Sequence, residues 1–443
     1  MNNIKLNISN KEIWKIALPI MIGNLAQTII IFTDTAFLGH IGMAELGASM
    51  MAGMYYYVFT TLAMGFAIGV QIFVARRYGE RNWAQIGDVF THGLVFVLLL
   101  GILLFGLLFL FSNQSLTKII ASQDILAGAK DYISIRQFGI MLVVVNYLFR
   151  SLYVGISQTR SITYSTILMA ITNILLDYIL IFGHWGFPQL GVKGAAIASL
   201  SAEAVAFVFF WIYTYCKIPK EYELFKYHPI QISLWWNILK VAFPVMIQHL
   251  LSFGTWFVFF VLIEKMGEQA IGISSLVRSV YMILLMPVFA FAVTANTLIS
   301  RIIGEGRAHQ VHALLWKVIG NCLVCTVPFV ILTFLLPLQV CSIYTDDAFL
   351  ASSAIPTVYI ICVATIISSV SIILFESISG TGNTISALVM DILATSVYMA
   401  FTVIVSSYLA IHFVWMAEWV YNIFIGVMSY CYLKYVNWQR KKI

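Results

Sequence analysis

Two aspartates stand within long apolar stretches of the chain, where a charged side chain is costly. They are Asp34 and Asp177. Asn173 precedes Asp177 by one helical turn, and Gln27 precedes Asp34 by two turns, so each lies on the face of its aspartate. Two carboxylates and an amide in a medium of low dielectric can share a proton, and their oxygens also suit Na⁺. An ionisable residue at such a position is a functional hypothesis by default.

The depths of the two aspartates agree. Counted from Lys15 and Arg160, the basic residues that begin the two stretches, both lie roughly 25–28 Å along a helix that rises about 1.5 Å per residue. Two helices running in one direction would bring both carboxylates to the same layer. The alternative is a structural polar cluster that only locks the two helices together, and the residues leave both hypotheses open.

Further ionisable side chains in apolar stretches are weaker candidates, each open between function and packing. They are Glu203, Asp391, Glu418 and His249, with Glu376 at a helix end. Arg278 could serve as a counter-charge to a central site or reach outward to the interface. Methionine and tyrosine side chains adapt to many flat ligands, although such stripes also face lipid. The candidates to line a substrate chamber are Met54, Tyr55, Arg278, Met282 and Met286.

Membrane-spanning helices must position these residues. Of 443 residues, 61% are hydrophobic and 10% are charged, whereas a soluble domain is about half apolar and about a quarter charged. A spanning helix needs roughly 20 mostly apolar residues, and the strands of a membrane barrel would be short and alternating. We expect an all-α polytopic protein with twelve spans: 13–38, 48–75, 89–112, 131–156, 162–183, 192–215, 234–263, 273–300, 313–338, 350–379, 385–408 and 411–433.

Basic residues divide unevenly between the two sides of the predicted membrane. Loops are counted alternately from a cytoplasmic N-terminus. Of the 25 lysines and arginines, the outer side holds Lys118, Lys130, Lys193 and Lys265, the spans hold Arg136 and Arg278, and the inner side holds the other nineteen. This asymmetry follows the positive-inside rule. It predicts a bacterial cytoplasmic membrane protein with both termini in the cytoplasm.

The chain repeats itself at an offset of 225 residues. Pro19-Ile-Met-Ile meets Pro244-Val-Met-Ile, Tyr56 meets Tyr281, and the same offset returns where Gly155 meets Gly380. We expect an N-terminal six-helix half, 1–215, a cytoplasmic linker, 216–232, and a C-terminal half, 233–443. Six is an even number of helices, so the repeats are parallel, an architecture that places substrate sites between halves that rock against each other.

The two halves differ at the acidic positions. At the repeat offset Asp34 meets Phe259 and Asp177 meets Thr402, so the coupling chemistry is expected in the first half. The matching prolines, Pro19 and Pro244, could bend the first helix of each half, or could be tolerated without a role.

Several classes of protein are excluded by motifs that the sequence lacks. It contains no GxxxxGK[ST] loop, HExxH, GxSxG elbow or kinase signature. Its six cysteines, including Cys322 and Cys325 within one apolar stretch, are expected to pack as small apolar residues, without disulfides or a zinc site. We expect no cofactor, no nucleic-acid partner and energy drawn from an ion gradient.

Three parts of the sequence together match the pattern of a known family. They are Pro19 with Asp34-Thr35 and Gly39, the Arg76 to Glu80 loop, and the segment from Asn173 through Asp177 to Gly183. In combination they resemble the multidrug and toxic compound extrusion (MATE) family over nearly the whole chain. The helix 1 aspartate with the Asn-x-x-x-Asp pair resembles the DinF-type branch. The NorM-type branch has an acidic residue in helix 7, where this chain offers only His249, Ser252 and Thr255.

The resemblance implies a V-shaped antiporter that exchanges protons or Na⁺ for organic, often cationic amphipathic compounds. It implies that Asp34, Asn173 and Asp177 bind the proton or Na⁺, that Gln27 is a further polar position, and that helix 1 bends at Pro19. It also implies that the protein lies in a lipid bilayer and acts on small molecules. No obligate protein partner is implied, so a monomer is expected. The alternatives are a flippase for lipid-linked saccharides or lipids, which needs a cavity rich in Arg and Lys, and an intramembrane transferase, whose Asp-rich motifs are missing.

Overall fold

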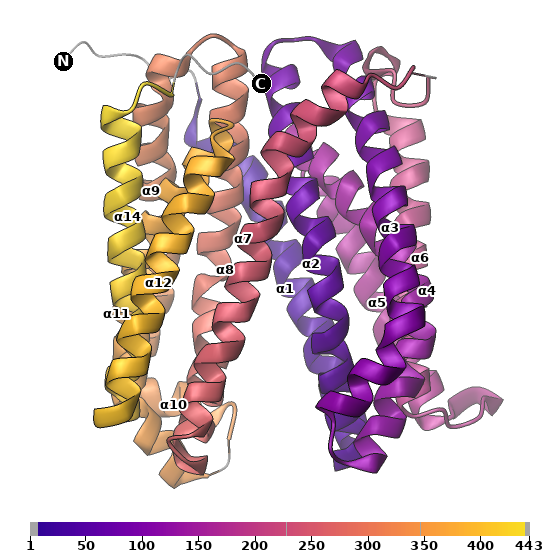
Figure 1. Ribbon diagram of the computed structural model, residues 1–443, viewed down its shortest axis with the longest axis vertical. Helices are drawn as coiled ribbons and strands as arrows, with labels where there is room; N and C mark the ends of the chain where they lie inside the picture. Colours follow the sequence, from indigo (N-terminus) through magenta and orange to yellow (C-terminus); the bar gives the residue numbers. More distant parts are fainter. Residues whose placement is uncertain (1–7, 227, 346, 439–443) are drawn as a thin grey trace. The chain divides into compact units, whose positions relative to one another are not determined.

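The computed structural model describes residues 8–226, 228–345 and 347–438, and these residues form helices joined by short turns, with no strand among them (Figure 1). Twelve spans within this part of the chain are long and apolar enough to cross a membrane. The predicted all-α fold with twelve spans is confirmed. Lys5, Arg440, Lys441 and Lys442, which contributed to the charge asymmetry, lie outside the described residues.

The helices follow one another along the chain with only short connections between them. In order, they are α1 (Asn10–Ile41), α2 (Met43–Gly79), α3 (Trp83–Ile119), α4 (Gln123–Gly155), α5 (Arg160–Phe182), η1 (His184–Gly186), α6 (Val192–Lys217), η2 (Lys220–Tyr222), α7 (Ile232–Glu264), α8 (Glu268–Gly304), η3 (Ala308–Gln310), α9 (Val311–Leu335), α10 (Pro337–Ser342), α11 (Ala348–Gly380), α12 (Thr384–Tyr408), α13 (Ile411–Trp415) and α14 (Ala417–Tyr435).

Two spans differ from their expected form. The ninth ends at Leu335 instead of 338, because Leu336 leaves helical geometry and Pro337 begins the short helix α10. A proline fits the first turn of a helix, where its missing N–H would be unpaired anyway. The last span consists of two helices, α13 and α14, which meet at Met416.

Packing divides the chain into two compact units whose borders fall inside helices. The N-terminal unit comprises Pro19–Tyr78 and Asn82–Met246, and the remaining described residues form the C-terminal unit. Helix α1 therefore changes unit at Pro19, and α7 changes unit after Met246, close to Pro244. The repeat halves 1–215 and 233–443 stay a prediction about sequence similarity, and they are not the packing units.

The N-terminal unit contains a close backbone approach between α2 and the first half of α7. A Cβ added at Gly65 would lie 2.6 Å from the Cα of Met246, and one added at Gly69 would lie 2.6 Å from the Cα of Ala242. Such distances leave no room for a side chain. Two glycines one helical turn apart therefore set the spacing of these two helices.

The expected linker, 216–232, packs against the start of α3. Tyr222 stacks on Trp83 with ring centroids 5.5 Å apart, and His228 Nδ1 lies 2.7 Å from Asp88 Oδ1. Burial in this contact raises the pKa of Tyr222 to about 12. The described part of the linker is therefore tied to α3.

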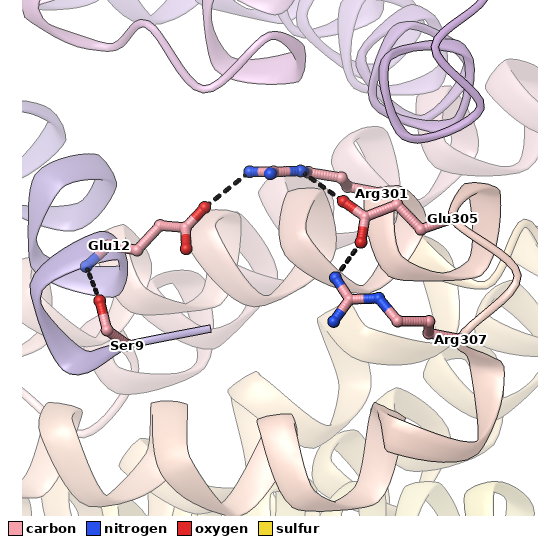
Figure 2. Close-up of polar contacts among 5 residues, drawn as sticks. All are labelled: Ser9, Glu12, Arg301, Glu305 and Arg307. Atoms are coloured by element: carbon pink, nitrogen blue, oxygen red, sulfur yellow. Dashed lines mark hydrogen bonds and ion pairs between the residues drawn. The ribbon is translucent and has the colours of Figure 1, made fainter. Parts of the chain in front are cut away.

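In the C-terminal unit, the first residues of α1 are held by charged side chains at the end of α8. Arg301 donates to Glu12 Oε1 at 2.8 Å and to Glu305 Oε1 at 3.0 Å, and Arg307 pairs with the other oxygen of Glu305 (Figure 2). The hydroxyl of Ser9 accepts the backbone N–H of Glu12 at 3.2 Å and so caps α1. The beginning of α1 is thus fixed by its own cap and by a chain of ion pairs.

We expect Gly69→Ala to destabilise the protein, because its new methyl group would press on the backbone of α7. Overpacking of this kind costs about 1–3 kcal/mol. Gly53→Ala on the same helix is the control, since nothing lies within 4 Å of its added Cβ. Thermal unfolding of both purified variants in detergent measures the effect. Equal melting temperatures for the two would contradict the close approach of α2 and α7.

Candidate functional site

Helices α1 and α5 bring the predicted trio of polar residues together within the N-terminal unit. Asp177 is fully buried and Asn173 is 1% exposed. The Asp34 carboxyl, half-buried on α1, faces both of these side chains closely enough to interact with them. The shared layer expected from the depths of the two aspartates is therefore found. Their role in ion coupling stays a prediction.

The polar atoms of this trio lack hydrogen-bond partners among the described residues. They are Asp34 Oδ1, both carboxyl oxygens of Asp177, and both the oxygen and the nitrogen of the Asn173 amide. Buried polar atoms are nearly always paired, so such a cluster calls for an explanation. Oxygens left free on two carboxylates and an amide can accept a shared proton or surround a small hard cation.

A continuous seam between α1 and α5 positions the trio. It starts at Pro19, whose carbonyl oxygen accepts the hydroxyl of Thr163 at 2.7 Å. Small side chains then let the helices approach closely, and an aromatic contact closes the far end. In order, the contacts join Pro19 to Thr163, Gly23 to Thr166, Ala26 and Ile30 to Ala170, Asp34 to Asn173 and Asp177, and Phe37 to Phe182.

The other two residues proposed for this site are placed differently. Gln27 is half-buried on α1, and its side chain makes no hydrogen bond to the trio within the described part of the chain. Pro19 lies buried inside the unbroken helix α1. The bend at Pro19 stays a prediction.

A second charged cluster, which the sequence did not reveal, lies in the same unit. Arg136 of α4 donates to Glu203 Oε1 of α6 at 2.7 Å, and its guanidinium lies 4.5 Å from the ring centroid of Tyr56. The Asn146 amide donates to the backbone oxygen of Glu203 at 3.0 Å. Arg136 is also the basic group that acts electrostatically on Asp34. The sequence signal that could have found this pair is one basic and one acidic residue in two different predicted spans.

The residues expected to line a chamber belong to different units. Met54 and Tyr55 lie on α2 in the N-terminal unit, whereas Arg278, Met282 and Met286 lie on α8 in the C-terminal unit. The exposed Arg278 places its guanidinium 5.2 Å from the ring centroid of Phe260. The chamber stays a prediction.

A scan against protein families returns one match that covers most of the chain. The model for MatE matches residues 19–179 and again 244–424, so its two copies begin at Pro19 and Pro244. The chain belongs to the MATE family. Members of this family are transporters, so the protein is a multi-pass membrane transporter and not an enzyme.

Similar proteins support this placement. The chain is 28% identical to "Probable multidrug resistance protein NorM" of Synechocystis over 76% of this chain and 73% of that protein. It is 26% identical to the protein of the same name from Thermotoga maritima over 87% and 82%. A solved MOP superfamily transporter from Pyrococcus furiosus shares the fold, with a TM-score of 0.88, 20% identity and coverage of 96% and 95%. The DinF-type branch stays a sequence prediction.

We expect the Arg136–Glu203 pair to respond to mutation as a buried ion pair. Arg136→Met or Glu203→Leu alone should destabilise the protein by about 3–5 kcal/mol, because each leaves one buried charge without its partner. The double variant should be more stable than either single variant. Thermal unfolding of the four proteins measures this difference. A double variant whose loss equals the sum of the two single losses would show that the charges do not interact.

Proposed function

We propose that this transporter is a multidrug efflux antiporter. It expels organic, often cationic amphipathic compounds in exchange for protons or Na⁺, which bind at Asp34, Asn173 and Asp177. One observation carries the proposal: a MATE-family chain in which two carboxylates and an amide converge across α1 and α5 with unpaired polar atoms. The names of the Synechocystis and Thermotoga relatives, which are called multidrug resistance proteins, support the substrate class.

The chemistry of the trio accounts for exchange. Two bare carboxylates at close range in low dielectric repel each other, so the site favours a bound proton or cation. Release of that cation leaves a buried, unneutralised pair, which favours either a new cation or a rearrangement of the α1–α5 seam. Because the seam continues to Pro19, where α1 changes unit, a change in the charge of the pair can alter the packing of α1 along its length.

An ion gradient suffices as the energy source. One charge moving through 100 mV yields about 2.3 kcal/mol, which supports roughly a 50-fold concentration difference of a substrate. Nothing in the sequence resembles an ATP-binding loop. The protein is proposed to act as a monomer in the bacterial cytoplasmic membrane, with both termini in the cytoplasm as the loop charges indicate.

The flippase alternative is not favoured. A cavity for an anionic lipid-linked saccharide would need several free basic side chains within the membrane. Of the two arginines that the loop count assigned to the membrane interior, Arg136 is engaged by Glu203 and Arg278 lies over Phe260.

We expect Asp34→Asn to abolish gradient-driven efflux, because an amide cannot carry the coupling proton or the charge. The measurement is accumulation of a fluorescent organic cation inside inverted membrane vesicles, whose cytoplasmic face is outward, under an imposed pH gradient or Na⁺ gradient. Glu268→Gln, on an exposed side chain at the start of α8, is the matched control. The gradient that drives export identifies the ion. Export that persists in Asp34→Asn would refute the coupling role.

Asp177→Asn tests whether the second carboxylate is part of the same site. We expect its efflux to follow a different pH profile from that of the wild type, because the remaining carboxyl would titrate alone. The same vesicle assay over a series of pH values provides the comparison. A profile identical to that of the wild type would assign Asp177 a structural role.

A further inference from the structure

The C-terminal unit also buries three carboxyl groups, on three helices. Asp391 of α12 is 2% exposed, Glu418 of α14 is 7% exposed, and Glu376 near the end of α11 is half-buried. Tyr421 lies among them, close enough to interact with all three. A carboxylate in such surroundings must be paired with a base, be held by hydrogen-bond donors, or bind a cation.

Neutral donors surround these acids. A tyrosine from each of α12 and α14 faces an acid on the other helix. Tyr421 of α14 donates to Asp391 Oδ1 at 2.8 Å, and Tyr398 of α12 lies close enough to Glu418 to interact with it. The two tyrosine rings lie 6.1 Å apart. From α8, the hydroxyl of Tyr281 donates to Glu418 Oε2 at 3.1 Å. Hydroxyl groups hold a carboxyl group in place, but they do not neutralise its charge.

No basic side chain neutralises the three acids within the described residues. None of the three carboxyl groups has a basic side chain among the described groups that act on it. Several bases of this unit make contacts elsewhere: Arg278 lies over Phe260, Arg301 pairs with Glu12 and Glu305, Lys317 donates to the Ile8 carbonyl, and Lys434 lies over Tyr430. Glu203 in the N-terminal unit differs from these acids, because the guanidinium of Arg136 lies 2.7 Å from its carboxylate.

A buried amide on α8 contacts the same cluster. Asn296 of α8 is 1% exposed and donates its side-chain amide to Glu376 Oε2 at 3.0 Å. Its other polar atom, Oδ1, has no hydrogen-bond partner among the described residues. An amide oxygen is satisfied only by a donor, so a protonated group can pair with it and a deprotonated carboxylate cannot.

We infer that Glu376, Asp391 and Glu418, held by Tyr281, Tyr398 and Tyr421, form a second proton-binding site of the transporter. Glu376 lies four residues before the end of α11 and Asp391 lies seven residues after the start of α12, whereas Glu418 lies at the start of α14. Hydroxyl donors directed at single oxygens suit protons better than a metal ion. No group of three His, Cys, Asp or Glu side chains with metal-binding spacing occurs in the described part of the chain. Participation of this site in exchange rests on the proposed function, whereas its binding of protons does not.

Infrared difference spectroscopy tests proton binding without substrate or gradient. The full-length protein is compared at acidic and alkaline pH in the Asp34→Asn/Asp177→Asn background, which removes the acids of the α1–α5 site. We expect a band of a buried protonated carboxyl group to remain in this background. Adding Glu376→Gln, Asp391→Asn and Glu418→Gln should remove it, whereas Glu268→Gln should leave it unchanged.

The outcomes separate this inference from the proposed function. Absence of the band in the Asp34→Asn/Asp177→Asn protein overturns the second site, and that result does not depend on whether any variant of the C-terminal acids folds. A band unchanged by Glu376→Gln, Asp391→Asn and Glu418→Gln together overturns it as well. Efflux that responds to neither gradient would refute the antiporter proposal while the band stands.

A transport measurement tests whether the second site takes part in the exchange cycle. Glu418→Gln in the otherwise wild-type protein should change the pH profile of vesicle efflux, whereas Glu268→Gln should not. Thermal unfolding first checks that the variant is folded. If it is, a pH profile equal to that of the control would exclude the second site from the exchange cycle.

Discussion

A carboxylate inside a bilayer has no water to solvate it, and the placement of the acids in this protein follows from that constraint. The chain meets it in three ways. Glu203 has a base, Arg136, at 2.7 Å. Asp391 and Glu418 have tyrosine hydroxyls and no base. Asp34 and Asp177 have each other and Asn173, with polar atoms left unpaired. The less the protein itself compensates a buried carboxylate, the more a bound proton or cation can stabilise it, so we expect only the second and third of these clusters to exchange ions.

The α1–α5 seam shows how ordinary packing makes such an exchangeable cluster possible. Close approach at Gly23 and Ala26 brings Asp34 within reach of α5, and the aromatic pair at Phe37 closes the seam beyond it. If these positions were large, the helices would separate and each aspartate would need its own partner. The seam also begins at Pro19, where α1 changes unit. There the Thr163 hydroxyl donates to the backbone carbonyl oxygen of Pro19. Charge and helix packing are thus coupled along one line of contacts.

The sequence predicted the parts of this arrangement that depend on one helix at a time. Hydropathy and loop charge were sufficient for twelve spans, and depth along the helix was sufficient to place Asp34 and Asp177 in one layer. It did not predict the Arg136–Glu203 pair or the convergence of Glu376, Asp391 and Glu418, because those depend on which faces of non-consecutive helices meet. The halves 1–215 and 233–443 stay a prediction about the sequence repeat, and the borders of the packing units within α1 and α7 are a separate, tertiary feature. The rotation of a helix about its axis, and the partner it crosses, are tertiary properties that apolar runs do not encode.

Comparison of the two halves at the repeat offset shows that each stabilises its buried carboxyl groups with different side chains. Tyr56 and Tyr281 occupy matching positions, yet one lies beneath the Arg136 guanidinium and the other donates to Glu418. At the place of Asn173 the second half has Tyr398, which lies close to Glu418, and in place of Asp34 it has Phe259, whose ring centroid lies 5.7 Å from that of Tyr398. The two halves therefore share the repeat but carry their acids on different helices. Acids that differ between the halves can bind cations independently, and a transporter that loads its two units separately gains a second means of coupling a gradient to its cargo.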